Sequence, residues 1–135
     1  MAKFVLTDAS VTLNSVDLSD HVSSVTLEIT ADEIVTTAMG DTFQARTGGL
    51  KDGTLSIEFQ QDFAASEVDA TLWPLLGSTT TFEVKPTSGA VSSTNPKYSG
   101  SVLVNSHSPV ANGVGELATM SVSFPTSGTI TRATS

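Results

Sequence analysis

Two stretches in which apolar and polar residues alternate constrain the fold of this chain more than any other part of it. Residues 25–30 and 54–60 place apolar side chains at every second position and Ser, Thr, Glu or Gln between them. A period of two residues is typical of a β-strand with one buried and one hydrated face. More than twenty residues without a helical pattern separate the two strands, whereas a tight hairpin needs only a few. We therefore expect a long inter-strand loop that serves as a functional arm, at about residues 37–53.

The composition indicates a mainly β protein and excludes several kinds of site. The 135 residues are rich in Ser, Thr, Val and Gly, and they contain no cysteine. Disulfides, thiolate metal ligands and cysteine nucleophiles are therefore excluded. The length suits a single domain over residues 1–135, and no apolar run approaches the ~20 residues of a membrane helix. The first ten residues lack a sustained apolar segment, so we expect synthesis in a cytoplasm without a secretory signal.

Negative charge is concentrated in the first half of the chain. The net charge is −8; residues 1–70 hold twelve acidic and three basic residues, and residues 71–135 hold two acidic and three basic residues. Because phosphate binding needs clustered Lys and Arg, we do not expect the chain to grasp nucleic acid. Alternatively, the negative charge serves only to keep the protein in solution.

One short helix is expected among the strands, at about residues 66–76. Ser66 suits its N-cap, while Pro74 and Gly77 would end it. Further strands are expected at about 11–13, 16–18, 80–85, 98–105 and 117–124, followed by a flexible C-terminal tail at about 126–135 that frays or adds to a neighbour. The fold class is therefore an antiparallel β-sandwich or barrel-like fold with one helix. The apolar face of the helix comprises Val68, Leu72, Leu75 and Leu76.

No set of catalytic, cofactor-binding or metal-ligating residues stands out in the sequence. His21 stands beside Asp20, and we interpret it as a surface hydrogen-bond partner rather than as a metal ligand; His107 is expected to be exposed to solvent. Asp32 and Glu33 are adjacent on a strand, so they point to opposite faces. Phosphate-binding and dinucleotide-binding glycine motifs are missing from the sequence. We expect neither an enzyme nor a cofactor or metal site.

The order of features along the chain resembles a known protein family. An acidic stretch, DLSDHVSSVTLE, precedes a turn of the type TxxGD at residues 37–41, then Arg46 and Gly-Leu-Lys-Asp at residues 49–52. The strand LSIEFQQDF and the helix ASEVDATLWPLL follow. In this order the features resemble the tail tube, or major tail, proteins of long-tailed non-contractile bacteriophages, over about residues 4–130.

The resemblance implies a structural virion protein, located in the tail and made in the cytoplasm of the host bacterium. Members of this family form hexameric rings, and the rings stack into the hollow tube through which DNA is ejected. Strands of each subunit join a barrel around the lumen, and a long loop reaches the adjacent ring. The implied partners are further copies of the chain and the tape-measure, tail-tip and tail-terminator proteins. Double-stranded DNA passes through the lumen without specific binding, and no membrane is involved.

Two sets of residues become candidates under this interpretation. The polar faces of the two alternating strands carry acids and hydroxyls without Lys or Arg, so they would not hold DNA; exposure to solvent on a monomer is the alternative. The arm would make the contact between rings. A tail-terminator or head–tail connector ring and an immunoglobulin-like adhesion or decoration module remain alternative functions. The proposed lumen-facing residues are Thr26, Glu28, Thr30, Ser56, Glu58 and Gln60, and the proposed inter-ring residues are Met39, Asp41, Phe43, Arg46, Leu50 and Lys51.

Overall fold

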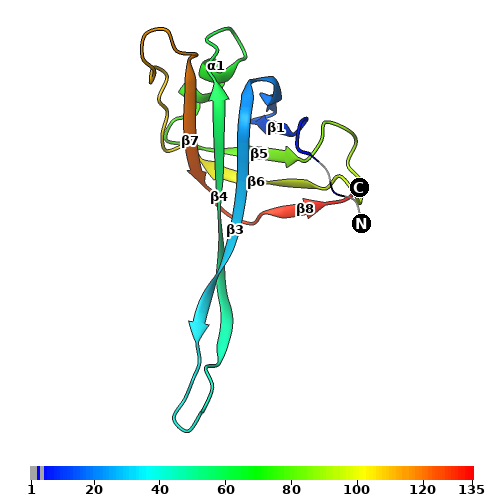
Figure 1. The fold of residues 1–135 in the computed structure, drawn as a ribbon, viewed down its shortest axis with the longest axis vertical. Helices are drawn as coiled ribbons and strands as arrows, with labels where there is room; N and C mark the ends of the chain where they lie inside the picture. Colours follow the sequence, from blue (N-terminus) through cyan, green and yellow to red (C-terminus); the bar gives the residue numbers. More distant parts are fainter. Residues whose placement is uncertain (1–2, 4) are drawn as a thin grey trace.

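Two antiparallel β-sheets make up most of the structure, a computed structural model that describes residue 3 and residues 5–135 (Figure 1). The larger sheet has the strand order β2-β1-β5-β6-β8, and the smaller sheet has the order β3-β4-β7. The expected mainly β, antiparallel fold with one short α-helix is confirmed. The elements are β1 (Ser10–Leu13), β2 (Val16–Asp17), η1 (Ser19–His21), β3 (Val22–Val35), β4 (Arg46–Gln60), α1 (Val68–Leu72), η2 (Trp73–Leu75), β5 (Thr79–Lys85), β6 (Lys97–Leu103), β7 (Thr119–Pro125) and β8 (Thr131–Ala133).

The hydrophobic core lies between the two sheets, whose strands run crosswise to one another in Figure 1. The odd-numbered residues of β4 from Leu55 to Phe59 and the even-numbered residues of β7 from Met120 to Phe124 are buried. Phe82 of β5 meets them from the larger sheet, and α1 adds its own apolar residues to the same cluster. The period-two pattern in the sequence therefore marks the inner face of the smaller sheet.

Strands β3 and β4 form one long hairpin in place of the expected long loop. Their pairing continues outward as far as Val35 opposite Arg46, so the connecting loop covers only residues 36–45. The expectation of a loop over residues 37–53 is wrong for residues 46–53, which belong to β4. Two of the three glycines there, Gly49 and Gly53, allow close packing instead of a turn. A Cβ on Gly49 would lie 2.8 Å from Cδ1 of Ile34 beside a bulge, and one on Gly53 would lie 2.7 Å from Cδ1 of Ile130.

The helical segment is shorter than expected and changes type along its length. Glu67 occupies the N-cap position of α1, whereas Ser66, the expected N-cap, has a left-handed backbone with φ 63°. The α-helix gives way to the 3-10 turn η2, which includes Pro74, and the segment ends at Gly77 with φ 88°. Leu76 of the expected apolar face is 45% exposed. In the described part of the chain, no helix is long and apolar enough to cross a membrane.

The C-terminal segment differs from the expected flexible tail because it adds a strand to the chain's own larger sheet. Strand β8 pairs with β6, and the backbone N–H of Ser127 donates to the carbonyl of Ser101 at 2.8 Å. Ile130 packs partly buried against the core. The tail is too polar to reveal this pairing by pattern, since only Ile130 among its residues carries a large apolar side chain.

Candidate functional site

The smaller sheet presents one continuous polar face on the side away from the core. Thr26 lies opposite Ser56, Glu28 opposite Thr54, and Ser24 opposite Glu58. Because residues directly opposite each other in an antiparallel pair project to the same side, all six predicted lumen residues share this face. All are exposed except Ser56, which is partly exposed.

Strand β7 widens this polar face, which the sequence did not reveal. Ser123 lies opposite Ser56, and their hydroxyl oxygens are 3.0 Å apart. Ser121 lies opposite Glu58 and donates its hydroxyl to Oε1 of Glu58 at 3.3 Å. The alternation in β7 predicts that one side of this strand is polar. Its pairing with β4 could not be predicted, because the paired residues are some sixty positions apart in the sequence. The full polar face therefore comprises Ser24, Thr26, Glu28, Thr30, Asp52, Thr54, Ser56, Glu58, Gln60, Thr119, Ser121 and Ser123.

The chemistry of the polar face is that of hydroxyls, one amide and three carboxylates. None of its members is Lys or Arg, and the carboxylates of Glu28, Asp52 and Glu58 give it a negative charge. A surface of this kind repels the phosphates of DNA and has no cations with which to displace counterions. It can stay hydrated beside a passing polyanion without binding it.

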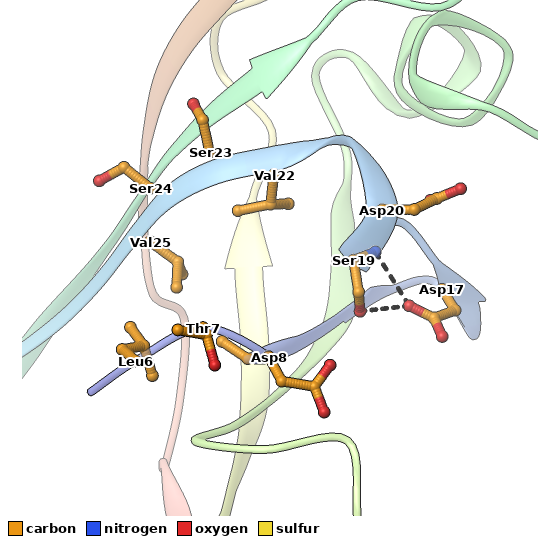
Figure 2. A pocket seen from close by; sticks show the side chains of 11 residues that line it. Leu6, Thr7, Asp8, Asp17, Ser19, Asp20, Val22, Ser23, Ser24 and Val25 are labelled. Carbon is orange, nitrogen blue, oxygen red and sulfur yellow. Dashed lines mark hydrogen bonds between the residues drawn. The ribbon is translucent and has the colours of Figure 1, made fainter. Parts of the chain in front are cut away.

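Both outer strands of the smaller sheet have a free edge. In the described residues, neither β3 nor β7 pairs with a strand on its outer side. The edge of β3 borders an open hollow of about 560 Å³, shown in Figure 2 between the segment with Leu6 and Asp8 and the first half of β3 with Val25. Among the residues that line this hollow, Ser19 donates its backbone N–H to Oδ1 of Asp17 at 2.9 Å. Free N–H and C=O groups along a strand edge are ready to pair with another chain.

Beyond the body of the protein, the β3–β4 hairpin projects as a two-stranded arm (Figure 1). The third strand ends where Pro125 of β7 lies opposite Thr54, so among the described residues no further strand lies beside the ribbon from Ile29 outward. Six of the fourteen exposed large apolar side chains in the described chain lie on this arm. They are Ile29 (47% exposed), Ile34 (48%), Val35 (56%), Met39 (102%), Phe43 (87%) and Leu50 (84%).

The tip of the arm is held in shape by its own hydrogen bonds. The carboxylate of Asp41 accepts the backbone N–H of Ala38 at 2.8 Å across a turn that includes Gly40, whose φ is 92°. The hydroxyl of Thr37 accepts the backbone N–H of Ala45 at 2.9 Å. Two predicted contact residues therefore also act within the arm, since Asp41 caps the turn and Arg46 forms an ion pair with Glu33.

Both histidines contact acids of the segment that contains the start of α1. The expectation of a solvent-exposed His107 is wrong, because its side chain is 0% exposed and its Nε2 lies 2.9 Å from Oδ1 of Asp69. His21 is 19% exposed and lies 2.6 Å from Oε2 of Glu67. These partners are 38 and 46 positions away in the sequence, so no local pattern indicates them.

Comparison with known proteins relates this fold to that of one chain in a solved particle structure. No protein-family model and no curated protein matches the chain. Among solved structures, a chain of the structure described as "Virion of native gene transfer agent (GTA) particle" superposes with a TM-score of 0.75 at 14% sequence identity. The superposition covers 93% of this chain and 95% of that chain. The likeness therefore extends over nearly the whole fold of both chains.

Proposed function

We propose that this chain is a structural virion protein whose copies form hexameric rings that stack into a hollow tail tube for DNA ejection. The observation that carries the proposal is the arm, a two-stranded ribbon whose apolar side chains are exposed in the single chain. A two-stranded hairpin is marginally stable in water by itself, and clustered exposed apolar side chains mark an interaction surface. The chain shares its fold with a chain of a virion particle, and this likeness supports the proposal that the exposed arm contacts other copies of the same protein.

Within a ring, the free edges of the smaller sheet supply the contacts. The outer edge of β3 in one copy pairs with the outer edge of β7 in the next, so that the small sheets join around the ring. A closed ring leaves no edge of the smaller sheet exposed, which removes the hazard that such edges present in a monomer. The polar face then lines the lumen, with Glu28 and Glu58 among its charged residues.

Between rings, the arm supplies the contact. Met39, Phe43 and Leu50 dock on the adjacent ring, with Asp41, Arg46 and Lys51 beside them. Head-to-tail stacking through such an arm is heterologous, and it therefore produces an open filament. The tube would be completed by tape-measure, tail-tip and tail-terminator proteins in the host cytoplasm, and DNA would pass through it without specific binding. The protein would perform no catalysis.

Electron microscopy of the purified protein over a concentration series tests this function. Residues 36–45 are replaced by Asn-Gly in a matched variant, which joins the Val35–Arg46 pair through a two-residue turn and removes the tip. The unmodified chain should form long hollow tubes with a regular axial repeat, whereas the variant should stop at rings or subunits. A cooperative thermal transition close to that of the unmodified chain verifies that the variant is folded.

The other outcomes of this experiment separate the alternative functions. Discrete rings of the unmodified chain at every concentration would indicate a tail-terminator or connector. Small particles at every concentration would favour an adhesion or decoration module. Normal tubes from the shortened variant would refute the assignment of the arm.

A further inference from the structure

A cluster of one imidazole and three carboxylates lies at the end of the smaller sheet that is opposite the arm. Nε2 of His21 is 2.6 Å from Oε2 of Glu67, 3.3 Å from Oδ2 of Asp62 and 3.8 Å from Oδ1 of Asp20. Asp20 and His21 belong to η1, directly before β3, and the other two residues belong to the segment between β4 and α1. The cluster therefore joins two parts of the chain that are about forty residues apart.

A backbone hydrogen bond orients the side chain of Asp62, and the main chain of Glu67 is held at the start of α1. Oδ1 of Asp62 accepts the backbone N–H of Ala64 at 2.9 Å, which leaves Oδ2 directed at His21. Glu67 is anchored as the N-cap residue of α1, and its carbonyl accepts the N–H of Thr71 at 3.0 Å. The side chains of His21, Glu67 and Asp62 are only 19%, 30% and 35% exposed. Supporting hydrogen bonds of this kind are what fix the ligands of a metal site.

The charges of the cluster are not balanced by the protein itself. Three carboxylates surround the imidazole, so even a protonated His21 would leave two negative charges. In the described residues, the ion pairs made by Lys or Arg are Arg46–Glu33 and Lys97–Glu83, neither of which reaches this cluster. A divalent cation would supply the missing positive charge while leaving the imidazole neutral, which is the form that binds metal.

We propose that His21, Glu67 and Asp20, whose ligand atoms all lie within 4.8 Å of one another, bind a divalent transition-metal ion, with Zn²⁺ as the best match and Asp62 beside the site. Nitrogen and oxygen ligands of tetrahedral Zn²⁺ lie about 2.0–2.1 Å from the metal and hence about 3.3 Å from one another. The ligand atoms of Asp20, His21 and Glu67 lie within 4.8 Å of one another, so side-chain rotations that draw them together would bring them to this spacing. Imidazole combined with carboxylates suits Zn²⁺ and Co²⁺ better than Ca²⁺ or Mg²⁺.

The ion would clamp the start of β3 to the segment that follows β4. These are the two strands that form the arm at their other ends, so the metal would secure the hairpin where it enters the body. The site is independent of the proposed tube, because it uses only residues of one chain.

Metal titration of the protein after treatment with a chelator tests the site. One equivalent of Co²⁺ per chain should produce the visible absorption of tetrahedral cobalt, and Zn²⁺ should displace it. Zn²⁺ at about a hundredfold excess over its dissociation constant should raise the unfolding temperature by about 5–10 °C. His21→Gln and Glu67→Gln should each weaken binding by at least about tenfold.

Two matched controls show whether the binding belongs to this cluster. His107→Gln removes the other imidazole, and Glu83→Gln removes an exposed carboxylate elsewhere; both should bind as the unmodified chain does. Circular dichroism without metal verifies the fold of each variant, and Glu67→Gln serves if His21→Gln does not fold. Absence of the cobalt spectrum in the unmodified chain overturns the proposal, as does binding that persists in both cluster variants.

Discussion

The contact made by the arm can be tested at Leu50, whose side chain is 84% exposed in the single chain. Because solvent already surrounds this side chain, Leu50→Ala should change the free energy of unfolding by no more than about 0.5 kcal/mol. If docking on the next ring buries the side chain, the substitution removes most of a contribution of about 1.5–3 kcal/mol. A loss of about 2 kcal/mol per subunit corresponds to a roughly 30-fold rise in the critical concentration for tube growth.

The critical concentration is measured by pelleting tubes over a concentration series and assaying the protein that stays in solution. Leu117→Ala is the matched control, since Leu117 is also exposed, at 66%, but lies before β7 and away from the arm. We expect this control to change the critical concentration less than about threefold. The reasoning is refuted if Leu50→Ala changes the critical concentration no more than Leu117→Ala does while both subunits remain folded.

Two further predictions concern the polar face and the base of the arm. Glu28→Lys combined with Glu58→Lys should leave tubes assembled but impair DNA delivery, because a basic lumen would hold phosphates; infectivity of virions carrying the double variant is the readout. Gly53→Ala should lower stability by about 1–3 kcal/mol, because its Cβ would lie 3.0 Å from Oγ1 and 3.2 Å from Cγ2 of the β-branched Thr126, as well as 2.7 Å from Cδ1 of Ile130. Gly48→Ala, with open space at the same position, should leave the unfolding temperature nearly unchanged.

Controls for the charge reversal use acids outside the polar face. Glu83→Lys combined with Glu116→Lys makes the same change in net charge but should not impair delivery. Unchanged infectivity of the Glu28 and Glu58 variant would argue against a lumenal position for this face.

For the glycines, equal melting temperatures of Gly53→Ala and Gly48→Ala would show that the C-terminal segment does not press on β4.

The faces of the smaller sheet could be predicted from sequence because they depend on local alternation. Leu55, Ile57 and Phe59 are buried as their spacing indicates, and Ser56 and Glu58 between them lie on the polar side. Burial on one face of a strand requires only that every second residue be apolar. The same information, however, does not identify which strands are neighbours.

Features that depend on contacts between distant segments could not be predicted. From their sequence neighbours alone, Gly49 and Gly53 predict breaks between strands. In the structure both lie within β4, where the absence of a side chain makes room for Ile34 and Ile130. The sequence predicts an exposed His107, because its partner Asp69 lies 38 positions away and no local pattern connects the two residues. The contacts of His21 with Glu67 and Asp62 could not be predicted for the same reason, since only Asp20 is its neighbour in the sequence.

The long ladder of the β3–β4 hairpin, which a bulge interrupts between Ala31 and Glu33, has a consequence for how the spacing between the proposed rings could change. Each additional residue pair would lengthen the ribbon by about 3.4 Å, and an insertion of two residues in each strand would preserve which side chains share a face. Such insertions would lie beyond the last contact with β7 and leave the core unaltered. The length of the arm could therefore change in steps of about 7 Å, by evolution or by design, while the core of the protein stays packed as it is.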